Sequence, residues 1–340
     1  LAMPLEAVDR SSADLTGPKM ANLAELAHQL QLTIPHGFVV TSAGFECFMT
    51  AGDLQAEINQ RMQAAEIERP DHLYALSTAI QQLIIQSPLP AVLAEAIAAA
   101  QQHMESVAGQ SVPLAVRSSA LGEDLAEASF AGQYRSVLNV GNEALSDAYK
   151  EVVASKYGMP AMSYRLHRGI RDEEVPMCVG CLQMVNAKAG GVLYTRNPVD
   201  IRDDALIIHG VWGLPKSVVD GTTATDQFIV HRGTPPTIAD RRIPHKAQQY
   251  VCYPDEGVCR LTLTGAQADS PCLSDPRVLA LAEMGMRIEA YYGQPQDVEW
   301  ALDNDDRLIL LQCRPLRQTA RGATELPPAD SRWPVCLQGG

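Results

Sequence analysis

The sequence predicts a soluble globular protein that mixes α-helices and β-strands, and three observations support this fold class. Of its 340 residues, 46% are hydrophobic and 20% are charged, which is enough apolar chain to build two or three subdomains. An Ala- and Gln-rich amphipathic stretch over 53–107 has the spacing of helices, with breaks near Pro70 and at Pro88–Pro90. Short apolar runs typical of strands follow at 176–185, 191–195, 205–209 and 227–231.

The composition excludes several classes of function. A net charge of −13 argues against a general nucleic-acid or membrane-surface binder, and we expect neither partner. No apolar run approaches the length of a membrane span, and the N-terminus has no signal-peptide pattern. Eight cysteines without a disulfide framework indicate reduced thiols and a cytoplasmic location. Because the chain begins with Leu1 and ends with two glycines, we expect it to be part of a longer protein.

Cys178 and Cys181 form a C-x-x-C pair inside a predicted strand. Side chains three residues apart on a strand face opposite ways, which suits neither a disulfide nor a shared zinc ion. We therefore expect both to be small buried hydrophobic residues.

The first structured unit begins at a turn formed by Gly17 and Pro18, after which apolar residues recur at helical spacing. Lys19 lies at the start of this helix, where unpaired backbone N–H groups favour an anion. A surface lysine whose stem covers apolar residues is the alternative interpretation. A short strand is predicted over 34–40, and Thr41 or Ser42 caps the helix that follows.

A second candidate ligand-binding segment lies at the end of a short apolar strand predicted over 113–120. Arg117, Ser118 and Ser119 place a guanidinium and two hydroxyls at its C-terminal end, where α/β-type folds tend to build ligand sites. The polar loop that follows contains Gly132 and other small residues, so its backbone can approach a phosphate closely. A solvent-exposed turn is the alternative for this loop.

Further helices are predicted over 145–156, 162–169 and 275–293, the last just ahead of a predicted hairpin. In that hairpin, Asp297 and Glu299 share one face of the first strand, and Gln312 and Arg314 share one face of the second. A two-residue turn at 304–305, or one step later, puts Gln312 opposite one of the two carboxylates. All four side chains then lie on one face.

Two carboxylates, an amide and a guanidinium on one sheet face suit a divalent cation that holds a polyphosphate. Carboxylates bind the hard cation Mg²⁺, and arginine takes non-bridging phosphate oxygens. An amphipathic hairpin with a solvated polar face is the commoner alternative.

Other ligand-binding motifs are unsupported. The segment 210–217 superficially resembles a phosphate-binding P-loop, but Pro215 precedes Lys216 where the motif requires glycine. No G-x-G-x-x-G follows a predicted strand, and nothing resembles a Ser-His-Asp or Cys-His hydrolase. The segment 240–271 matches no motif.

Five segments in this order resemble one family. They are Gly-Pro-Lys-Met-Ala-Asn-Leu from Gly17, Val-Arg-Ser-Ser-Ala from Val116, Ala-Ser-Phe-Ala-Gly-Gln from Ala128, Gln-Met-Val from Gln183, and Asp-Val-Glu-Trp from Asp297 with Leu-Gln-Cys-Arg-Pro behind it. Over residues 15–316 the chain is similar to the N-terminal nucleotide-binding domain of phosphoenolpyruvate synthase (pyruvate, water dikinase) and pyruvate phosphate dikinase. Each motif alone is weak, but five in one order are specific.

The resemblance implies an α+β fold of the ATP-grasp type, with ATP held between two α+β subdomains. These are expected over 1–185, with the helical region 53–107 inserted in it or packed on it, and over 186–317. The hairpin, taken as 295–315, would be the Mg²⁺ and phosphate platform of the second subdomain. Residues 318–340 would be a linker into a phosphohistidine domain.

By the same resemblance, Lys19 and Arg117 bind the ATP phosphates and Arg314 steadies the charge of the transferring group, which makes these three the catalytic candidates. Mg²⁺ and phosphate are assigned to Asp297, Glu299 and Gln312. The remaining ATP contacts fall on the loop residues Ser129, Gly132 and Gln133, on the hinge residues Gln183, Met184 and Val185 at the adenine edge, and on Asp226.

Relatives of this kind phosphorylate a histidine on a separate swivelling domain, release AMP, and pass the phosphate to pyruvate on a barrel domain. None of the eight histidines here lies in the Thr-Gly-Gly…Cys-His context of that carrier. We therefore expect the chain to bind Mg·ATP without completing turnover, with both partner domains beyond residue 340.

One departure and two alternatives accompany the resemblance. The family usually has Gly-Gly-Lys before the first helix, whereas Pro18 stands before Lys19 here and lacks an N–H, so we expect one backbone donor to phosphate fewer. The same ATP half-reaction could serve another acceptor, as in rifampicin phosphotransferase or glucan water dikinase. A nucleotide-sensing module without catalysis is the other alternative, although such a module need not keep both carboxylates and Arg314.

Overall fold

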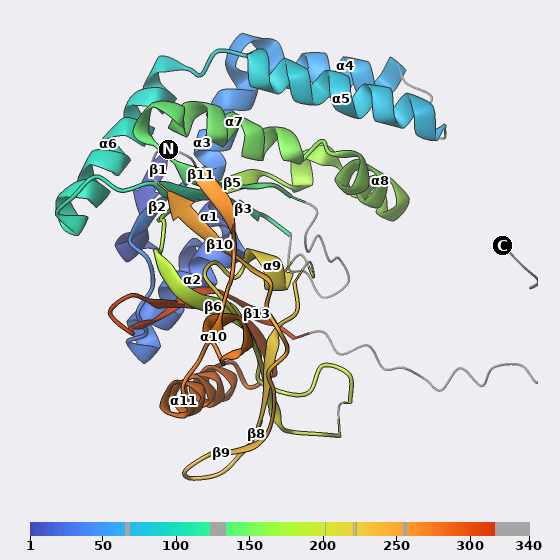
Figure 1. Ribbon diagram of the computed structural model, residues 1–340. Helices are drawn as coiled ribbons and strands as arrows, with labels where there is room; N and C mark the ends of the chain where they lie inside the picture. The colour runs from blue at the N-terminus through green and yellow to red at the C-terminus, as the bar shows by residue number, and fades with distance from the viewer. Residues whose placement is uncertain are drawn as a thin grey trace, which may run out of the picture.

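The structure, a computed structural model, describes residues 1–64, 69–122, 134–200, 202–219, 221, 223–253 and 257–316. It confirms the predicted mixture of helices and strands. Two antiparallel sheets lie one above the other, and most of the helices cover the upper sheet (Figure 1). The predicted linker over 318–340 lies outside the described residues.

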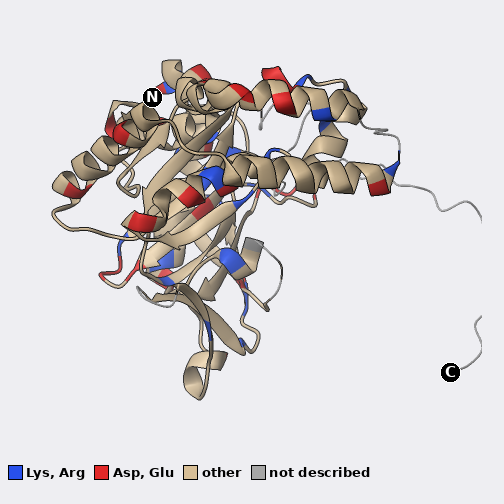
Figure 2. Ribbon diagram, turned by 90° about the horizontal axis from the view of Figure 1, so that it is seen from above, with Lys and Arg blue, Asp and Glu red and all other residues tan. Residues whose placement is uncertain are grey.

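The upper sheet is built from the first 183 residues of the chain. In the described residues its strand order is β1 (Ala2–Pro4), β2 (Gly37–Val40), β5 (Met177–Gln183), β3 (Leu114–Ala120) and β4 (Ser136–Val140). One hydrophobic core joins this sheet to helices α3 (Ser42–Thr50), α4 (Leu54–Ala64), α5 (Pro70–Gln86), α6 (Ala91–Ala108), α7 (Leu145–Ser155) and α8 (Met159–Arg168). Acidic residues are spread over these helices when the molecule is seen from above (Figure 2).

Helices α5 and α6 begin where the sequence predicts. Pro70 occupies the first turn of α5, and Pro90 is the N-cap of α6, because proline has a fixed φ and needs no intrahelical donor there. In the described residues no single helix is both long and apolar enough to cross a membrane; α5 and α6 reach that composition only as a pair bent by 75°.

The lower sheet comes from the C-terminal half. Its order within the described residues is β13 (Leu308–Pro315), β12 (Gln296–Asp303), β6 (Ala187–Tyr194), β7 (Leu206–Trp212), β8 (Asp226–His231) and β9 (Thr237–Arg242). Helix α11 (Asp275–Tyr292) packs on one face, where Trp300 and Phe228 are fully buried. A separate hairpin of β10 (Gln248–Tyr253) and β11 (Gly257–Thr262) lies ahead of the short helix α10 (Ala266–Asp269).

Helix α2 (Pro18–Leu30) contacts both halves. Leu23 and Leu26 belong to the core of the lower sheet, although they lie near the N-terminus. On the other side, a Cβ on Gly180 of β5 would lie 2.3 Å from the sulfur of Met20, so the missing side chain lets the helix approach the upper sheet. The predicted division into 1–185 and 186–317 therefore follows the sheets but not the two cores, and it stays a prediction.

The two cysteines of the C-x-x-C pair confirm the prediction made for them. Both are fully buried on β5, with Cys181 in the core of the upper sheet and Cys178 in the core of the lower one. Their side chains thus face opposite ways, as alternation along a strand requires.

Several strands were not predicted. Strands β4 and β9 carry mostly partly or fully exposed residues, and β10 and β11 have no alternation of buried and exposed positions. The hydrophobic pattern that marks a half-buried strand is therefore missing from their sequences. The segment 240–271, which matched no motif, contains the β10–β11 hairpin and α10.

Candidate functional site

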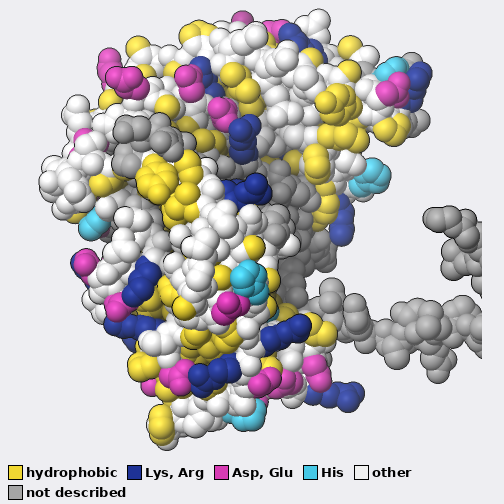
Figure 3. Space-filling model, in the orientation of Figure 1, with side chains coloured by type: hydrophobic (Ala, Val, Ile, Leu, Met, Phe, Trp, Pro, Cys, Tyr) yellow, Lys and Arg dark blue, Asp and Glu magenta, His cyan; other side chains and the backbone are white. Residues whose placement is uncertain are grey.

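A cavity of about 760 Å³ opens between the two sheets and collects most of the predicted site residues. Eight of them line it: Lys19, Arg117, Gln183, Met184, Val185, Glu299, Gln312 and Arg314. The described lining contains five basic residues and a single acidic one, Glu299, whereas the whole chain has 27 basic and 40 acidic residues. Basic side chains are visible near the middle of the face in Figure 3. This local excess of positive charge suits an anionic ligand.

The β12–β13 hairpin brings its four polar side chains to one face, as predicted. Asp297 is opposite Arg314, and Glu299 is opposite Gln312. The predicted two-residue turn was wrong, however. Asp303 N–H donates to the Arg307 carbonyl at 3.1 Å, so the turn contains three residues, the last in the left-handed region with a φ of 60°. Three-residue hairpin turns commonly end on a residue of this conformation.

A β-bulge aims the two polar side chains of β13 at the cavity. The register shifts between Glu299 and Trp300, so that Leu311 has no partner of its own on β12. Leu310 and Cys313, three residues apart, both lie in the core of the lower sheet, which strict alternation would forbid. Without the extra residue, Gln312 would share the core-facing side with Leu310; bulges often re-aim side chains next to sites in this way.

Arg117 joins the two sheets through three hydrogen bonds. Its Nη2 donates to Glu299 Oε2 and to Gln312 Oε1, both at 2.9 Å, and its Nη1 donates to the Leu311 carbonyl at 3.3 Å. The bulge residue Leu311 thus supplies a carbonyl acceptor for Arg117, and the bulge also changes the direction in which the Gln312 side chain points. Because Arg117 lies on β3 and its acceptors lie on β12 and β13, the contact fixes one sheet against the other.

The two hairpin carboxylates experience different electrostatic surroundings. Burial by itself would raise the pKa of Glu299, but the Arg117 guanidinium, with Arg314 and Lys19 nearby, lowers that pKa below its usual value. Asp297 accepts from Arg314 Nε at 2.9 Å and Nη2 at 2.7 Å. Burial nevertheless raises the pKa of Asp297, because Arg314 offsets it only in part and Glu299 adds a like charge. Glu299 is therefore the carboxylate held most firmly in its ionised form.

Lys19 is positioned by the serines of β3. Gly17 has a φ of 75°, and a Cβ there would lie 1.7 Å from the Ser119 carbonyl oxygen, so only glycine fits this turn. Lys19 Nζ donates to Ser118 Oγ at 3.3 Å, and the N–H of residue 20 donates to Ser119 Oγ at 3.3 Å. Pro18 occupies the first turn of α2, where its missing N–H would have no intrahelical acceptor.

The other end of the cavity is apolar. A small cluster there contains Ala187, Leu214 and Ala301, with Met184, Val185, Tyr250, Cys252, Val258 and Leu311 packed against it. Of the predicted hinge, the N–H of Gln183 donates to the His36 carbonyl at 2.7 Å and that of Met184 to the Pro113 carbonyl at 2.8 Å. These two donors are therefore already engaged within the protein.

The structure does not bring every predicted residue to the cavity. Asp226 is fully buried, where it pairs with Lys246 Nζ at 2.5 Å and accepts from the Cys272 N–H at 2.7 Å. These contacts tie it to the loops beneath the β10–β11 hairpin, so it cannot serve as a nucleotide ligand without breaking them. Asp297 is 8% exposed and reaches the cavity only through its pair with Arg314.

Three predicted residues, Ser129, Gly132 and Gln133, lie outside the described residues. The cavity also has walls that the sequence did not predict, among them the start of β4, Leu214, Val258 and Lys216. For Lys216 a signal was present in the rejected P-loop resemblance: the motif was absent, but its lysine faces the same cavity.

Comparison with known proteins assigns the chain to a family. The family described as "Pyruvate phosphate dikinase, AMP/ATP-binding domain" matches residues 13–332. The chain belongs to this family. The match includes every described residue of the cavity wall.

Three curated relatives illustrate the likeness. A protein named "Probable phosphoenolpyruvate synthase" from Methanocaldococcus jannaschii is 32% identical over 324 residues, 94% of this chain and 27% of its own length. "Phosphoenolpyruvate synthase" from Pyrococcus furiosus is 31% identical over 98% of this chain and 46% of its own. "Rifampicin phosphotransferase" from Bacillus cereus is 32% identical over 92% of this chain and 35% of its own. The chain thus spans about a quarter to a half of the length of these relatives.

Proposed function

We propose that the cavity binds ATP with Mg²⁺ in an ATP-grasp arrangement, as the nucleotide half of a phosphoenolpyruvate synthase-like dikinase. The observation that carries this proposal is the contact of Arg117 with Glu299 and Gln312. It joins two sheets inside a basic cavity, in a chain of the AMP/ATP-binding domain family.

The polar end of the cavity would hold the triphosphate. Lys19, Arg117 and Arg314 supply the positive charge that phosphate oxygens require. Their fixed positions matter because phosphoryl transfer depends on positioning and charge neutralisation more than on covalent chemistry from the protein.

Magnesium would be held by the hairpin. Glu299 lines the cavity and pairs with Arg117 through Oε2, so its Oε1 can act as a ligand. The Gln312 amide oxygen accepts from Arg117 and has a second lone pair for the ion. Asp297 does not line the cavity, so its Oδ1, which the pair with Arg314 leaves unused, would have to turn toward the cavity to be a third ligand. Oxygen donors of this kind fit Mg²⁺. When bound, the ion would supply positive charge that offsets the negative charge of the phosphates.

The apolar end would hold the adenine ring. The ring would lie against Leu214, Ala301 and Met184. Because the N–H groups of Gln183 and Met184 are engaged elsewhere, the adenine edge would meet the N–H of Val185 or the carbonyl groups of this hinge. Ser129, Gly132 and Gln133, which lie outside the described residues, would be further ATP contacts.

The reaction would transfer phosphate from ATP to a histidine on a further domain and then to pyruvate, with AMP as a product. Support comes from the relatives named phosphoenolpyruvate synthase, which are two to four times longer than this chain. A swivelling phosphohistidine domain and a pyruvate-binding barrel domain are the partners proposed for that additional length.

A second candidate keeps the ATP half-reaction and changes the acceptor. The likeness to a protein named rifampicin phosphotransferase, at 32% identity, favours it specifically. An acceptor assay on the full-length protein separates the two: conversion of ATP to AMP with pyruvate supports the first candidate, and conversion only with another acceptor supports the second.

Isothermal titration of the chain with ATP, with and without Mg²⁺, tests the binding proposal. We expect binding that requires Mg²⁺ and that weakens more than about tenfold in Glu299→Gln, since a hydrogen bond to a charged group contributes about 1.5–3 kcal/mol. Glu283→Gln, on the exposed side of α11, is the matched control and should bind like the wild type. Wild-type protein that does not bind ATP, or equal binding by Glu299→Gln, would contradict the proposal.

A further inference from the structure

Lys216 lines the cavity, although neither the predicted site nor the resemblance includes it. It begins the short helix α9 (Lys216–Val219), which follows strand β7 after a three-residue turn. Its surroundings show that the position of its backbone is fixed by tight contacts rather than left to a surface loop.

The turn that leads to Lys216 is held against the β10–β11 hairpin. Gly213 has a φ of 75°, and a Cβ there would lie 2.1 Å from the Tyr250 carbonyl oxygen. The N–H of Leu214 donates to the same carbonyl at 2.8 Å. Only glycine permits this approach, so β7 ends in a turn of defined direction.

Pro215, the residue before Lys216, fixes how far the Lys216 backbone lies from the lower sheet. Pro215 packs on Gly190 of β6, where a Cβ would lie 2.7 Å from the proline Cδ. Gly190 is opposite Ala301 on β12, and Ala301 belongs to the apolar end of the cavity. The side chain of Lys216 therefore starts from a backbone position just beyond the apolar end of the cavity.

The distance between the apolar end and the polar end of the cavity suits the length of a lysine side chain. Glu299 is two residues from Ala301 along β12, which corresponds to about 7 Å. The four-carbon stem of Lys216 can span part of that distance and place its ammonium between the two ends. A nucleotide whose base lies at Ala301 and whose outer phosphates lie at Glu299 has its innermost phosphate at this level.

The other cations of the described wall are held in other places: Lys19 donates to Ser118 Oγ at 3.3 Å, and three arginines pair with carboxylates. Arg117 is bonded to Glu299, Arg314 to Asp297 and Arg135 to Glu151 at 3.1 Å. Lysine differs from these arginines in carrying three rotatable donors on a flexible stem. Such a group can follow a phosphate whose position changes as the outer phosphates leave.

We propose that Lys216 contacts the phosphate nearest the nucleoside, and so contributes to the binding of AMP as well as of ATP. The inference rests on the proposed function, because it takes the occupant of the cavity to be an adenine nucleotide.

Titration calorimetry with ATP, AMP and adenosine tests it on the wild type, Lys216→Ala and Lys188→Ala. Lys188 lies on β6 and pairs with Asp306 at the surface, away from the cavity, so it is the matched control. We expect Lys216→Ala to weaken ATP and AMP about tenfold each, as the loss of one charge-assisted hydrogen bond does, with adenosine unchanged. Lys216→Arg should retain most of the affinity.

The other results overturn the inference in separable ways. A loss for ATP without a loss for AMP would place Lys216 at the outer phosphates. Equal binding of ATP and AMP by wild type and Lys216→Ala would make it a surface lysine without a ligand. Wild-type protein that does not bind ATP would overturn the proposed function and this inference together. Similar unfolding temperatures of the variants would exclude a structural cause.

Discussion

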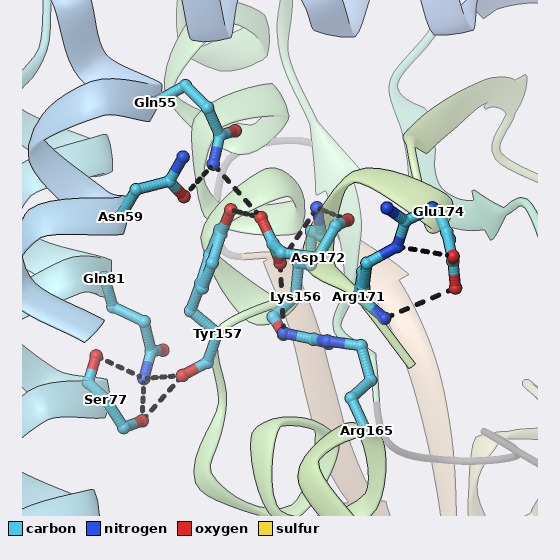
Figure 4. A network of polar contacts seen from close by, with 10 residues as sticks. All are labelled: Gln55, Asn59, Ser77, Gln81, Lys156, Tyr157, Arg165, Arg171, Asp172 and Glu174. Atoms are coloured by element: carbon cyan, nitrogen blue, oxygen red, sulfur yellow. Dashed lines mark hydrogen bonds and ion pairs between the residues drawn. The ribbon is translucent and has the colours of Figure 1, made fainter. Parts of the chain in front are cut away.

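Two clusters of buried charge in this chain use the same side-chain chemistry to different ends. The first lies among the helices that cover the upper sheet (Figure 4). The Asp172 carboxylate forms ion pairs with Lys156 Nζ at 3.1 Å and with Arg165 Nη2 at 3.5 Å, and Tyr157 Oη donates a hydrogen bond to it at 2.6 Å. The second is the contact of Arg117 with Glu299 and Gln312 in the cavity.

The first cluster is closed and local in sequence. Its side chains are 1%, 4% and 9% exposed for Lys156, Arg165 and Asp172, and none of them lines the cavity. All lie within 17 positions of one another (156 to 172): Lys156 directly follows α7, Arg165 lies on α8, and Asp172 begins a short 3-10 helix after α8. These charges are satisfied by each other and by two neutral donors, Tyr157 Oη and Gln55 Nε2 of α4, the latter at 3.2 Å from Asp172. The cluster therefore stabilises the packing of one region.

The second cluster is open and distant in sequence. Arg117 and Glu299 are 18% and 13% exposed, face a cavity and are separated by 182 positions. Shifted pKa values do not separate the two clusters, because burial lowers the pKa of Lys156 to about 8 although Asp172 opposes it. The difference teaches that access and convergence of elements, rather than a perturbed pKa alone, mark the functional site here.

We expect the largest effect, a loss of stability, from a substitution that breaks the closed cluster. Asp172→Asn leaves two buried cations without their carboxylate, which lowers the free energy of unfolding by about 3–5 kcal/mol. Urea unfolding measures it, with Asp147→Asn as control, since Asp147 is 74% exposed in its pair with Lys150. ATP affinity of the folded protein should be unchanged. A loss of stability below about 1 kcal/mol, as for a surface pair, would contradict this account.

The next effect concerns the open cluster. Arg117→Met removes three hydrogen bonds, two of them to side chains of the hairpin, and should weaken ATP binding about 100-fold, equivalent to about 2.7 kcal/mol. Calorimetry gives the affinity. Arg171→Met, at an exposed pair with Glu174, controls for loss of charge. An affinity within threefold of wild type would show that Arg117 only joins the sheets.

A smaller effect concerns the β10–β11 hairpin, which forms part of the cavity wall. Asn139 Nδ2 on β4 donates to the Tyr253 carbonyl at 2.7 Å and so ties the hairpin to the upper sheet. Asn139 has a φ of 59°, so Asn139→Gly keeps the backbone conformation and removes only the bond, at a cost of about 1 kcal/mol. Hydrogen exchange should quicken in β10 and β11 while β7 serves as the internal reference. Unchanged exchange in the hairpin would contradict this role.

The smallest effect is the pH dependence of the closed cluster. Burial alone would raise the pKa of Asp172, but Lys156 and Arg165 lower it below 3.8. A lowered carboxyl pKa contributes stability above its unfolded value, and that stability is lost as the pH falls through the folded value. The stability difference between wild type and Asp172→Asn should therefore be constant from pH 7 to 5 and shrink below about pH 4. A difference that grows on acidification would reverse the assigned sign.

The sequence predicted the elements that carry a strong hydrophobic period. Helices α4 to α6 and α11 have buried positions at helical spacing. Strand β5 is a short run of buried apolar residues, and β12 alternates large apolar residues with polar ones in its sequence up to Ala301. The sequence also predicted that four hairpin side chains share a face. Strand β9 could not be predicted, because most of its residues are exposed and it forms only by pairing with β8.

Within the site, the sequence predicted residue types better than geometry. The bulge at Leu311 is invisible to a period of two, since Leu308 to Leu311 is uniformly apolar. Asp226 has a carboxylate in a suitable place along the chain, yet the partner that buries it, Lys246, lies 20 positions away in an unassigned segment. Lys216 was set aside with its motif. Each case depends on a contact between distant segments, which a local pattern does not contain.

One measurement tests the central claim that the open cluster binds Mg·ATP while the closed cluster only stabilises. Thermal unfolding of the wild type, Asp172→Asn and Glu299→Gln is followed with and without saturating Mg·ATP, since a ligand of the native state raises the unfolding temperature. We predict a lower unfolding temperature for Asp172→Asn with the ligand-induced rise intact. For Glu299→Gln we predict a smaller change in the unfolding temperature and a loss of that rise. A rise retained by Glu299→Gln and lost by Asp172→Asn would contradict the account.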